Sequence, residues 1–190
     1  MNFLAHAFLA RNSETLLVGN FIGDFVKGNQ FYHFHPGIVN GILLHRKIDH
    51  FTDNHPVFRR SRKRIREKYR HYSGVIIDLY YDHFLAKNWE DYANKSLKEF
   101  ASQVYRTIQD HVDVIPLRAK NMLPYMIKYN WLVNYATIEG IDQSLKGISR
   151  RTKHVSGMEN AWEDLLDHYG EFEKDFCEFF PEIMAFTDGQ

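Results

Sequence analysis

Apolar residues recur at the spacing of an α-helix along most of the chain. No run shows the strict alternation of apolar and polar residues that marks a β-strand, and no fixed-period repeat is evident. The sequence therefore predicts an all-α fold, a helical bundle. The apolar pattern predicts helices over residues 3–10, 14–27, 36–53, 57–72, 75–86, 96–114, 117–135, 138–153 and 159–186.

Glycine and proline modify this pattern at a few positions. Gly19 and Gly23 weaken the second helix, so we expect them to allow the backbone of another segment to approach closely. Pro36 suits the first turn of the central helix. Ser73 and Gly74 predict a break before the next helix, and Pro181 predicts a kink in the last one.

The chain has 190 residues, of which 44% are hydrophobic, and this size suits a single domain over residues 1–190. The single cysteine, Cys177, excludes an internal disulfide and a cysteine-based zinc site. No stretch approaches the roughly 20 apolar residues of a membrane span. The apolar start lacks a basic segment and is interrupted by His6, so it is a poor signal peptide. These features favour a soluble, cytoplasmic protein.

The densest polar stretch lies at residues 45–56, within and after the predicted central helix. His45, Asp49 and Asp53 recur at intervals of four residues, so all three fall on one helix face. Polar residues at this spacing are often a solvated face. Apolar neighbours such as Ile48 and Phe51 argue against that here, because carboxylates are rarely buried unless paired or metal-bound.

A second stretch repeats the arrangement. Asp78 and Asp82 are again four residues apart in a strongly apolar run, and His83 follows directly. His6 and Asp24 lie in apolar surroundings nearer the start of the chain. For Asp24 a capping or paired role near a helix end is the alternative.

These candidates are all histidines and aspartates, a ligand set that suits a divalent ion such as Mn²⁺, Mg²⁺ or Fe²⁺. A helical bundle can build such a site from facing helices. A metal there lowers the pKa of bound water and stabilises charge on a phosphoryl group, which predicts metal-assisted hydrolysis of a phosphate ester. The alternative is a scaffold protein whose buried His and Asp side chains only pair with one another.

Charge is uneven along a chain whose formal net charge is zero. Residues 59–70 hold eight basic residues against Glu67, and residues from 159 onward hold ten acidic residues against Lys174. A basic helix is also the feature of a nucleic-acid-binding module, but overall neutrality makes that alternative less favourable. Intramolecular pairing of the two charged segments is a further alternative.

Four motifs together resemble the acyl carrier protein phosphodiesterase family, also called ACP hydrolases. The motifs are residues 2–6 (NFLAH), residues 19–29 from Gly19-Asn20 to Asp24-Phe25-Val26-Lys27-Gly28-Asn29, residues 45–54, and Asp78 with Asp82-His83-Phe84-Leu85. The similarity extends to Trp162 and His168-Tyr169, and so covers nearly the whole chain.

The resemblance implies hydrolysis of holo-acyl carrier protein to the apo protein and 4′-phosphopantetheine. It also implies Mn²⁺ and a divergent branch of the HD-type metal-dependent phosphohydrolases. The usual adjacent His-Asp pair is missing, and its nearest equivalent is His45 with Asp49. An HD-type nucleotide phosphohydrolase is therefore the alternative within enzymes.

On this basis we assign expected roles. The expected metal ligands are His6, Asp24, His45, Asp49 and Asp78. The residues expected to orient ligands or the attacking water are Asp53, Asp82 and His83. Lys27 and Arg46 are expected to hold the phosphate.

Acyl carrier proteins are strongly acidic, so the basic run after the central helix is the expected docking surface. Its residues are Arg59, Arg60, Arg62, Lys63, Arg64 and Arg66. If these do not dock the partner, Arg150, Arg151 and Lys153 are the next candidates. The sequence indicates no nucleic-acid or membrane partner and leaves the oligomeric state open.

Overall fold

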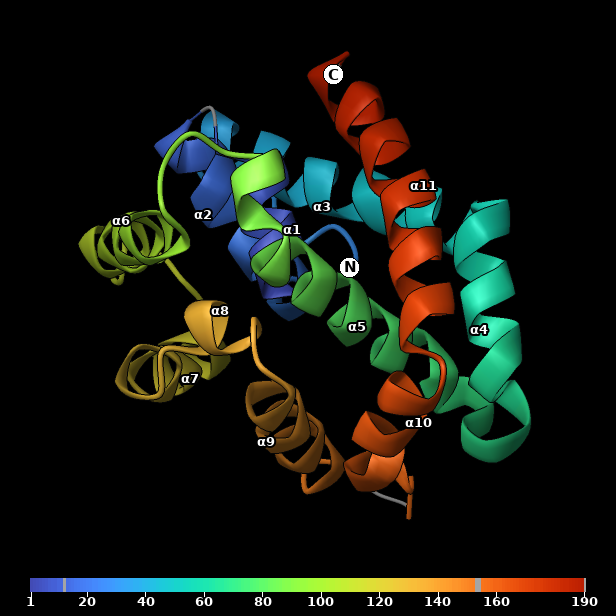
Figure 1. Ribbon diagram of the computed structural model, residues 1–190. Coiled ribbons are helices and arrows are strands. Elements are labelled where there is room, and N and C mark those ends of the chain that lie inside the picture. The colour runs from blue at the N-terminus through green and yellow to red at the C-terminus, as the bar shows by residue number, and fades with distance from the viewer. Residues whose placement is uncertain (12, 153–154, 190) are drawn as a thin grey trace.

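The computed structural model describes residues 1–11, 13–152 and 155–189. These residues form helices joined by short connections and contain no β-strand, which confirms the predicted all-α fold (Figure 1). The α-helices are α1 (Phe3–Leu9), α2 (Glu14–Ile22), α3 (Pro36–Asn54), α4 (Pro56–Tyr69), α5 (Ser73–Lys87), α6 (Leu97–Asp110), α7 (Leu117–Lys128), α8 (Trp131–Asn134), α9 (Ile138–Ser149), α10 (Ala161–Asp167) and α11 (Tyr169–Asp188). None of the described helices is both long and apolar enough to cross a membrane.

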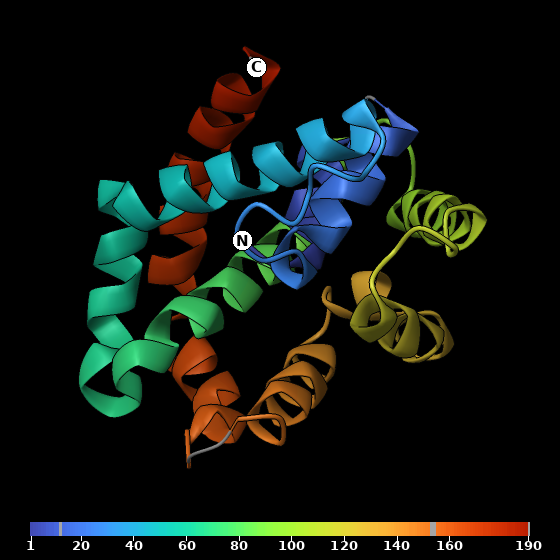
Figure 2. The same ribbon diagram turned by 180° about the vertical axis from the view of Figure 1, so that it is seen from behind.

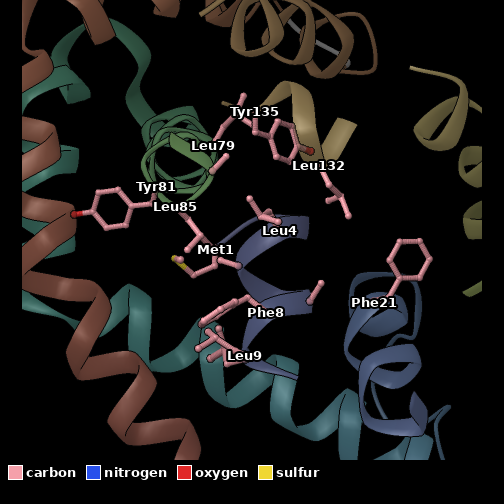
Figure 3. Close-up of a cluster of buried hydrophobic side chains, with 14 of the residues drawn as sticks. Met1, Leu4, Phe8, Leu9, Phe21, Leu79, Tyr81, Leu85, Leu132 and Tyr135 are labelled. Atoms are coloured by element: carbon pink, nitrogen blue, oxygen red, sulfur yellow. The ribbon is translucent and has the colours of Figure 1, made fainter. Parts of the chain in front are cut away.

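Helix α5 lies at the centre of the arrangement, with α4 and α11 on one side and the α6–α9 segment on the other (Figures 1 and 2). Its side chains are buried around most of its circumference, including Ile76, Leu79, Tyr80 and Tyr81. Helix α1 packs against α5, and Figure 3 shows Leu4 and Phe8 on the side of α1 that faces Leu85. Burial of α1 and α5 against each other fixes the start of the chain in the core.

Helices α2 and α3 pack with their backbones almost in contact. A Cβ atom placed on Gly19 would lie 2.0 Å from the Ile38 carbonyl oxygen, and one on Gly41 would lie 2.3 Å from that of Leu16. Only glycine fits at either position. The close approach predicted for Gly19 is confirmed, and it brings α3 next to the polar residues of α2.

Several predicted helices end earlier than expected or are interrupted. The second helix stops at Ile22 and continues as a 3₁₀ turn, Gly23–Phe25. Asn130 adopts a left-handed conformation (φ 43°) and separates α7 from α8. His168 separates α10 from α11. The break expected at Ser73 and Gly74 occurs slightly earlier, where Arg70 has a φ of 49°, and α5 begins at Ser73.

Candidate active site

Two histidines and an aspartate from different helices meet at one point. His6 comes from α1, and His45 and Asp49 come from α3. The Nε2 atom of His6 lies 3.1 Å from Oδ1 of Asp49, and Nε2 of His45 lies 3.1 Å from Oδ2. One ligand atom from each residue lies within 4.8 Å of the others, so all three can reach a single ion.

Asn20 of α2 fixes the orientation of both imidazole rings. Its Oδ1 atom accepts hydrogen bonds from Nδ1 of His6 (2.7 Å) and Nδ1 of His45 (3.3 Å). The rings are stacked with their centroids 4.1 Å apart. With a proton on each Nδ1, both Nε2 atoms are turned toward Asp49. Such an outer partner is what metal-ligating histidines normally have.

The 3₁₀ turn after α2 adds a second carboxylate. Oδ1 of Asp24 lies 3.2 Å from Nε2 of His45. Gly23 makes room for this contact, because a Cβ atom there would lie 2.3 Å from the His45 ring. Gly23 is therefore approached closely by the side chain of His45. The prediction that a backbone would approach Gly23 is wrong.

The cluster favours positive charge on His45 and disfavours it on His6. Burial and the charge of His45 lower the pKa of His6 to about 4. Burial also opposes the charged form of His45, but hydrogen bonds to Asp24 and Asp49 outweigh it and raise its pKa to about 9. Despite burial, hydrogen bonds from the two histidines hold the pKa of Asp49 well below its usual range. The hydrogen bond to His45 likewise lowers the pKa of Asp24.

A polar hollow of about 180 Å³ opens beside the cluster. The ammonium group of Met1 lies in its wall, 2.8 Å from Oδ1 of Asp78 and 3.9 Å from Oδ1 of Asp49. The structure thus brings Asp53 and Asp78 to the same hollow as Asp24 and Asp49. Its lining residues are Met1, Asp24, Asp49, Thr52, Asp53 and Asp78.

Asp82 lies next to this region but faces the start of helix α1. Its carboxylate is fully buried and accepts hydrogen bonds from the backbone N–H groups of Asn2 (3.3 Å), Leu4 (2.8 Å) and Ala5 (3.1 Å). Burial raises the pKa of Asp82 to about 7, although these N–H groups pull it down. Asp82 therefore satisfies the free donors of α1, the helix that carries His6.

His83 faces away from the cluster. Its Nδ1 atom donates to the carbonyl oxygen of Tyr135 (2.7 Å), and its Nε2 atom accepts from the hydroxyl of Tyr169 (2.8 Å). Burial lowers its pKa. The structure does not bring His83 together with His6 and His45, and both of its ring nitrogens are already occupied.

The two expected phosphate-binding residues lie at the loop that follows the 3₁₀ turn. Arg46 donates to the carbonyl oxygens of Val26 (3.0 Å) and Gly28 (2.7 Å), and its guanidinium lies over the ring of Phe31. Arg46 thus holds the loop, whereas Lys27 within that loop is exposed.

Two arginines of α4 pair with acids inside the molecule. Arg60 lies 2.6 Å from Asp175 and 2.5 Å from Glu178, and Arg64 also pairs with Asp175. Asp175 is only 1% exposed and accepts a further hydrogen bond from Ser61. Arg60 and Arg64 therefore fasten α4 to α11, as the alternative of intramolecular pairing predicts.

The remaining basic residues of α4 lie on another face. Arg59 donates to Asn54 and to the carbonyl of Asp53, and Arg62 lies 3.8 Å from Asp53 at the hollow. Lys63 and Arg66 are exposed, and neither forms an ion pair with another described residue. Of the alternative docking residues, Arg150 and Arg151 are exposed on the surface, and Lys153 lies outside the described residues.

Three site groups were not anticipated from the sequence. Asn20 is 0% exposed, and its position in an apolar run of α2 was a usable signal for a buried role. The Met1 ammonium gave no such signal, because only folding brings it to Asp78. Thr52 is buried in the wall of the hollow, and its hydroxyl has no partner among the described residues.

Comparison with known proteins gives one consistent result. The family model for acyl carrier protein phosphodiesterase matches residues 1–183. The chain is 34% identical to the acyl carrier protein phosphodiesterase of Photorhabdus laumondii over 185 residues, which cover 97% of this chain and 93% of the relative. It is 36% identical to that of Shigella boydii over 186 residues, covering 97% and 96%. No solved structure matches the chain.

These matches, together with the helical fold and its His and Asp cluster, define the class of protein: it is a phosphodiester hydrolase. The resemblance seen in the sequence is confirmed, and the chain belongs to the acyl carrier protein phosphodiesterase family.

Proposed function

We propose that this protein is a metal-dependent phosphodiesterase acting on holo-acyl carrier protein. It hydrolyses the phosphodiester that links 4′-phosphopantetheine to a serine of the carrier, leaving apo-carrier and free 4′-phosphopantetheine. The observation that carries the metal dependence is the convergence of His6, His45 and Asp49 within 4.8 Å. The substrate follows from the family to which the chain belongs.

The donor set fits a divalent ion. A neutral His6 carries one ring proton, and Asn20 takes the hydrogen bond from Nδ1. Nε2 of His6 lies 3.1 Å from a carboxylate oxygen of Asp49, so these two atoms can be ligands of the same ion. Imidazole nitrogens with carboxylate oxygens suit Mn²⁺, with Mg²⁺ or Fe²⁺ as alternatives.

The charge of the hollow supports the same conclusion. Four aspartates, Asp24, Asp49, Asp53 and Asp78, line it, and the Met1 ammonium opposes only part of their charge. A phosphodiester is itself an anion and would be repelled. His6, His45, Asp49 and Asp24 would hold a divalent ion, which would supply the missing positive charge, polarise the phosphoryl group and lower the pKa of bound water.

The side chains around the ligands have separate tasks in this proposal. Asn20 holds both imidazoles with Nε2 directed at the site. Asp53 borders the hollow with an exposed carboxylate, so it orients the attacking water and accepts its proton. Asp78 holds the Met1 ammonium, and Asp82 fixes the start of α1. His83 has no part in the chemistry.

Substrate contacts follow from the surface around the hollow. Arg46 holds the loop of residues 26–31 in place, and the exposed Lys27 of that loop contacts the phosphate. Arg59, Arg62, Lys63 and Arg66 share the outer face of α4, on which Arg59 and Arg62 contact Asp53. This basic face docks the acidic carrier protein, because complementary charge speeds the encounter of two proteins.

The proposal is tested with purified protein, holo-acyl carrier protein and Mn²⁺, followed by the mass of the carrier. We expect the carrier to lose the mass of 4′-phosphopantetheine, and chelation of the metal to abolish the loss. A panel of nucleotides serves as alternative substrates and should remain intact. Hydrolysis of nucleotides without change in the carrier, or full carrier hydrolysis after complete removal of metal, would contradict the proposal.

A further inference from the structure

A cavity of about 310 Å³ lies between α8 and α9, outside the metal cluster. It falls in the size range of small-molecule sites. Its walls include the aromatic side chains of Tyr129, Trp131 and Tyr135 and the side-chain-free surface of Gly147. Arg150 and Arg151 stand at the same cavity. None of these residues has a task in the proposed hydrolysis.

The cavity and the hollows at the metal cluster share wall residues at the start of the chain. Asn2 and Phe3 line it, and the same two residues line a small hollow whose other walls include His6 and His45. Met1 belongs to this small hollow and to the polar hollow of Asp49 and Asp53. Residues 1–3 therefore border all three spaces in turn, from the polar hollow to the cavity, and the middle hollow has a volume of only about 10 Å³. In Figure 2 the start of the chain lies between α4 and the α8–α9 segment.

Asn2 and Phe3 contact the aromatic wall of the cavity and also helix α5. Phe3 packs against Trp131 of α8 with ring centroids 6.5 Å apart. The side-chain amide of Asn2 donates to the hydroxyl of Tyr135 (3.5 Å), while its backbone N–H donates to Asp82. The aromatic wall is thus fixed relative to the helix that carries His6.

We infer that this cavity holds the pantetheine arm of the substrate while its phosphodiester lies at the metal cluster. The inference rests on the proposed function and adds a substrate subsite to it. The arm is a flexible chain with methyl groups, amide groups and a terminal thiol. Aromatic faces such as Trp131 pack against its apolar parts, and Ser144 and Gln143 offer polar groups to its amides. The basic face of α4 lies at the polar hollow of Asp49 and Asp53, where the carrier protein docks.

Glycine 147 provides the means to test this without disturbing the fold. A Cβ atom there meets nothing within 4 Å, and phenylalanine is a better helix former than glycine. Gly147→Phe should therefore fold and fill the cavity. Gly170 of α11 is the matched control, because a Cβ atom there also meets nothing within 4 Å and it does not line the cavity. Ser144→Phe is a second cavity-filling variant one turn earlier on α9.

The experiment measures binding of pantetheine and of 4′-phosphopantetheine by calorimetry, with thermal midpoints to establish folding. We expect the wild-type protein and Gly170→Phe to bind both compounds, and Gly147→Phe and Ser144→Phe to bind both at least about tenfold more weakly. Equal binding by wild type and both cavity variants would overturn the inference. So would a wild-type protein that fails to bind pantetheine.

Turnover of holo-carrier separates this inference from the proposed function. Gly147→Phe should reduce kcat/KM, whereas Gly170→Phe should not. If Gly147→Phe turns the carrier over like the wild type, the subsite is wrong and the phosphodiesterase activity stands. If it loses turnover but still binds 4′-phosphopantetheine, the cavity contacts the carrier protein and the inference is overturned. If the wild type does not release the prosthetic group, the proposed function fails, and the binding data alone decide the subsite.

Discussion

The imidazole rings of His6 and His45 are stacked with centroids 4.1 Å apart and an interplanar angle of 19°. Two imidazoles this close cannot both carry charge at low cost, and their pKa values diverge to about 4 and about 9. A single amide oxygen of Asn20 contacts Nδ1 of both rings. The two rings come from different helices, and Asn20 orients them so that both Nε2 atoms face the carboxylate of Asp49.

The first prediction concerns Asn20. Asn20→Ala should lower the affinity for Mn²⁺ by about 10- to 100-fold, because both imidazoles lose the partner that sets their tautomer and orientation. Asn20→Asp keeps an oxygen acceptor and should retain more of the affinity. Calorimetric titration with Mn²⁺ measures both. Asn54→Ala removes an exposed amide at the end of α3 and should have no effect, and an equal loss in both alanine variants would refute the orienting role.

A second prediction follows from the pKa of Asp82, which burial raises to about 7 from an ordinary value of 3.8. Between about pH 4 and pH 7 the folded protein keeps a proton that the unfolded chain loses. The free energy of unfolding therefore falls as the pH rises through this window, and the contribution of Asp82 is constant above it. Asp82→Asn cannot lose a proton, so it should gain stability relative to wild type between pH 4 and pH 7, by up to about 4 kcal/mol.

Thermal unfolding of both proteins at several pH values measures this difference. Asp175→Asn is the control, since Asp175 is equally buried but hydrogen bonds from Ser61, Arg60 and Arg64 outweigh burial and lower its pKa. The stability that the ionised Asp175 carboxylate adds to the fold is fully present above the ordinary aspartate pKa. Asp175→Asn should therefore be destabilised evenly between pH 5 and pH 8. A pH-independent difference between wild type and Asp82→Asn would show that Asp82 is charged throughout the range.

The third prediction separates the two faces of α4. The double variant Lys63→Glu and Arg66→Glu should lower kcat/KM for holo-carrier by about tenfold at low salt, with kcat and Mn²⁺ binding retained, because exposed charges act on the encounter. Added salt should shrink the difference. Lys98→Glu with Arg106→Glu reverses two exposed charges on α6 and serves as the control. Unchanged kcat/KM at low salt would move the docking surface elsewhere, first to Arg150 and Arg151.

Arg64→Glu should behave differently from these surface variants. Arg64 pairs with the buried Asp175, and reversal of its charge leaves two carboxylates facing each other in a buried setting. We expect loss of folded protein, measured by the thermal midpoint, in place of a selective effect on kcat/KM. A well-folded Arg64→Glu with normal stability would show that this pair does not hold α4 to α11.

The helical spacing of apolar residues was sufficient to predict the fold class and most helix positions. It failed where a single residue ends a helix by its backbone conformation, as at Asn130 and His168. Nothing in the apolar periodicity distinguishes those residues from their neighbours. The central helix was predicted almost to its end because Pro36 and Pro56 mark its limits in the sequence.

The candidate site was predicted where its residues share one helix, as His45 and Asp49 do. Sequence spacing could not predict which partner each of two neighbouring buried polar residues contacts. Asp82 and His83 are both buried in α5, yet one caps α1 and the other links Tyr135 to Tyr169. Which partner a buried side chain meets depends on how helices pack, and the sequence pattern of one helix does not contain that information. The relation to HD-type phosphohydrolases stays a prediction.

The most direct test of the central claim combines Mn²⁺ binding with turnover in Asp49→Asn. Asp49 is the carboxylate that both Nε2 atoms face, so its loss should remove stoichiometric Mn²⁺ binding and lower holo-carrier hydrolysis by far more than about tenfold. The thermal midpoint should show a folded protein, and Asp91→Asn, an exposed aspartate, should match the wild type. Wild-type Mn²⁺ binding and near-normal turnover in Asp49→Asn would contradict the account, because the metal would then lie elsewhere.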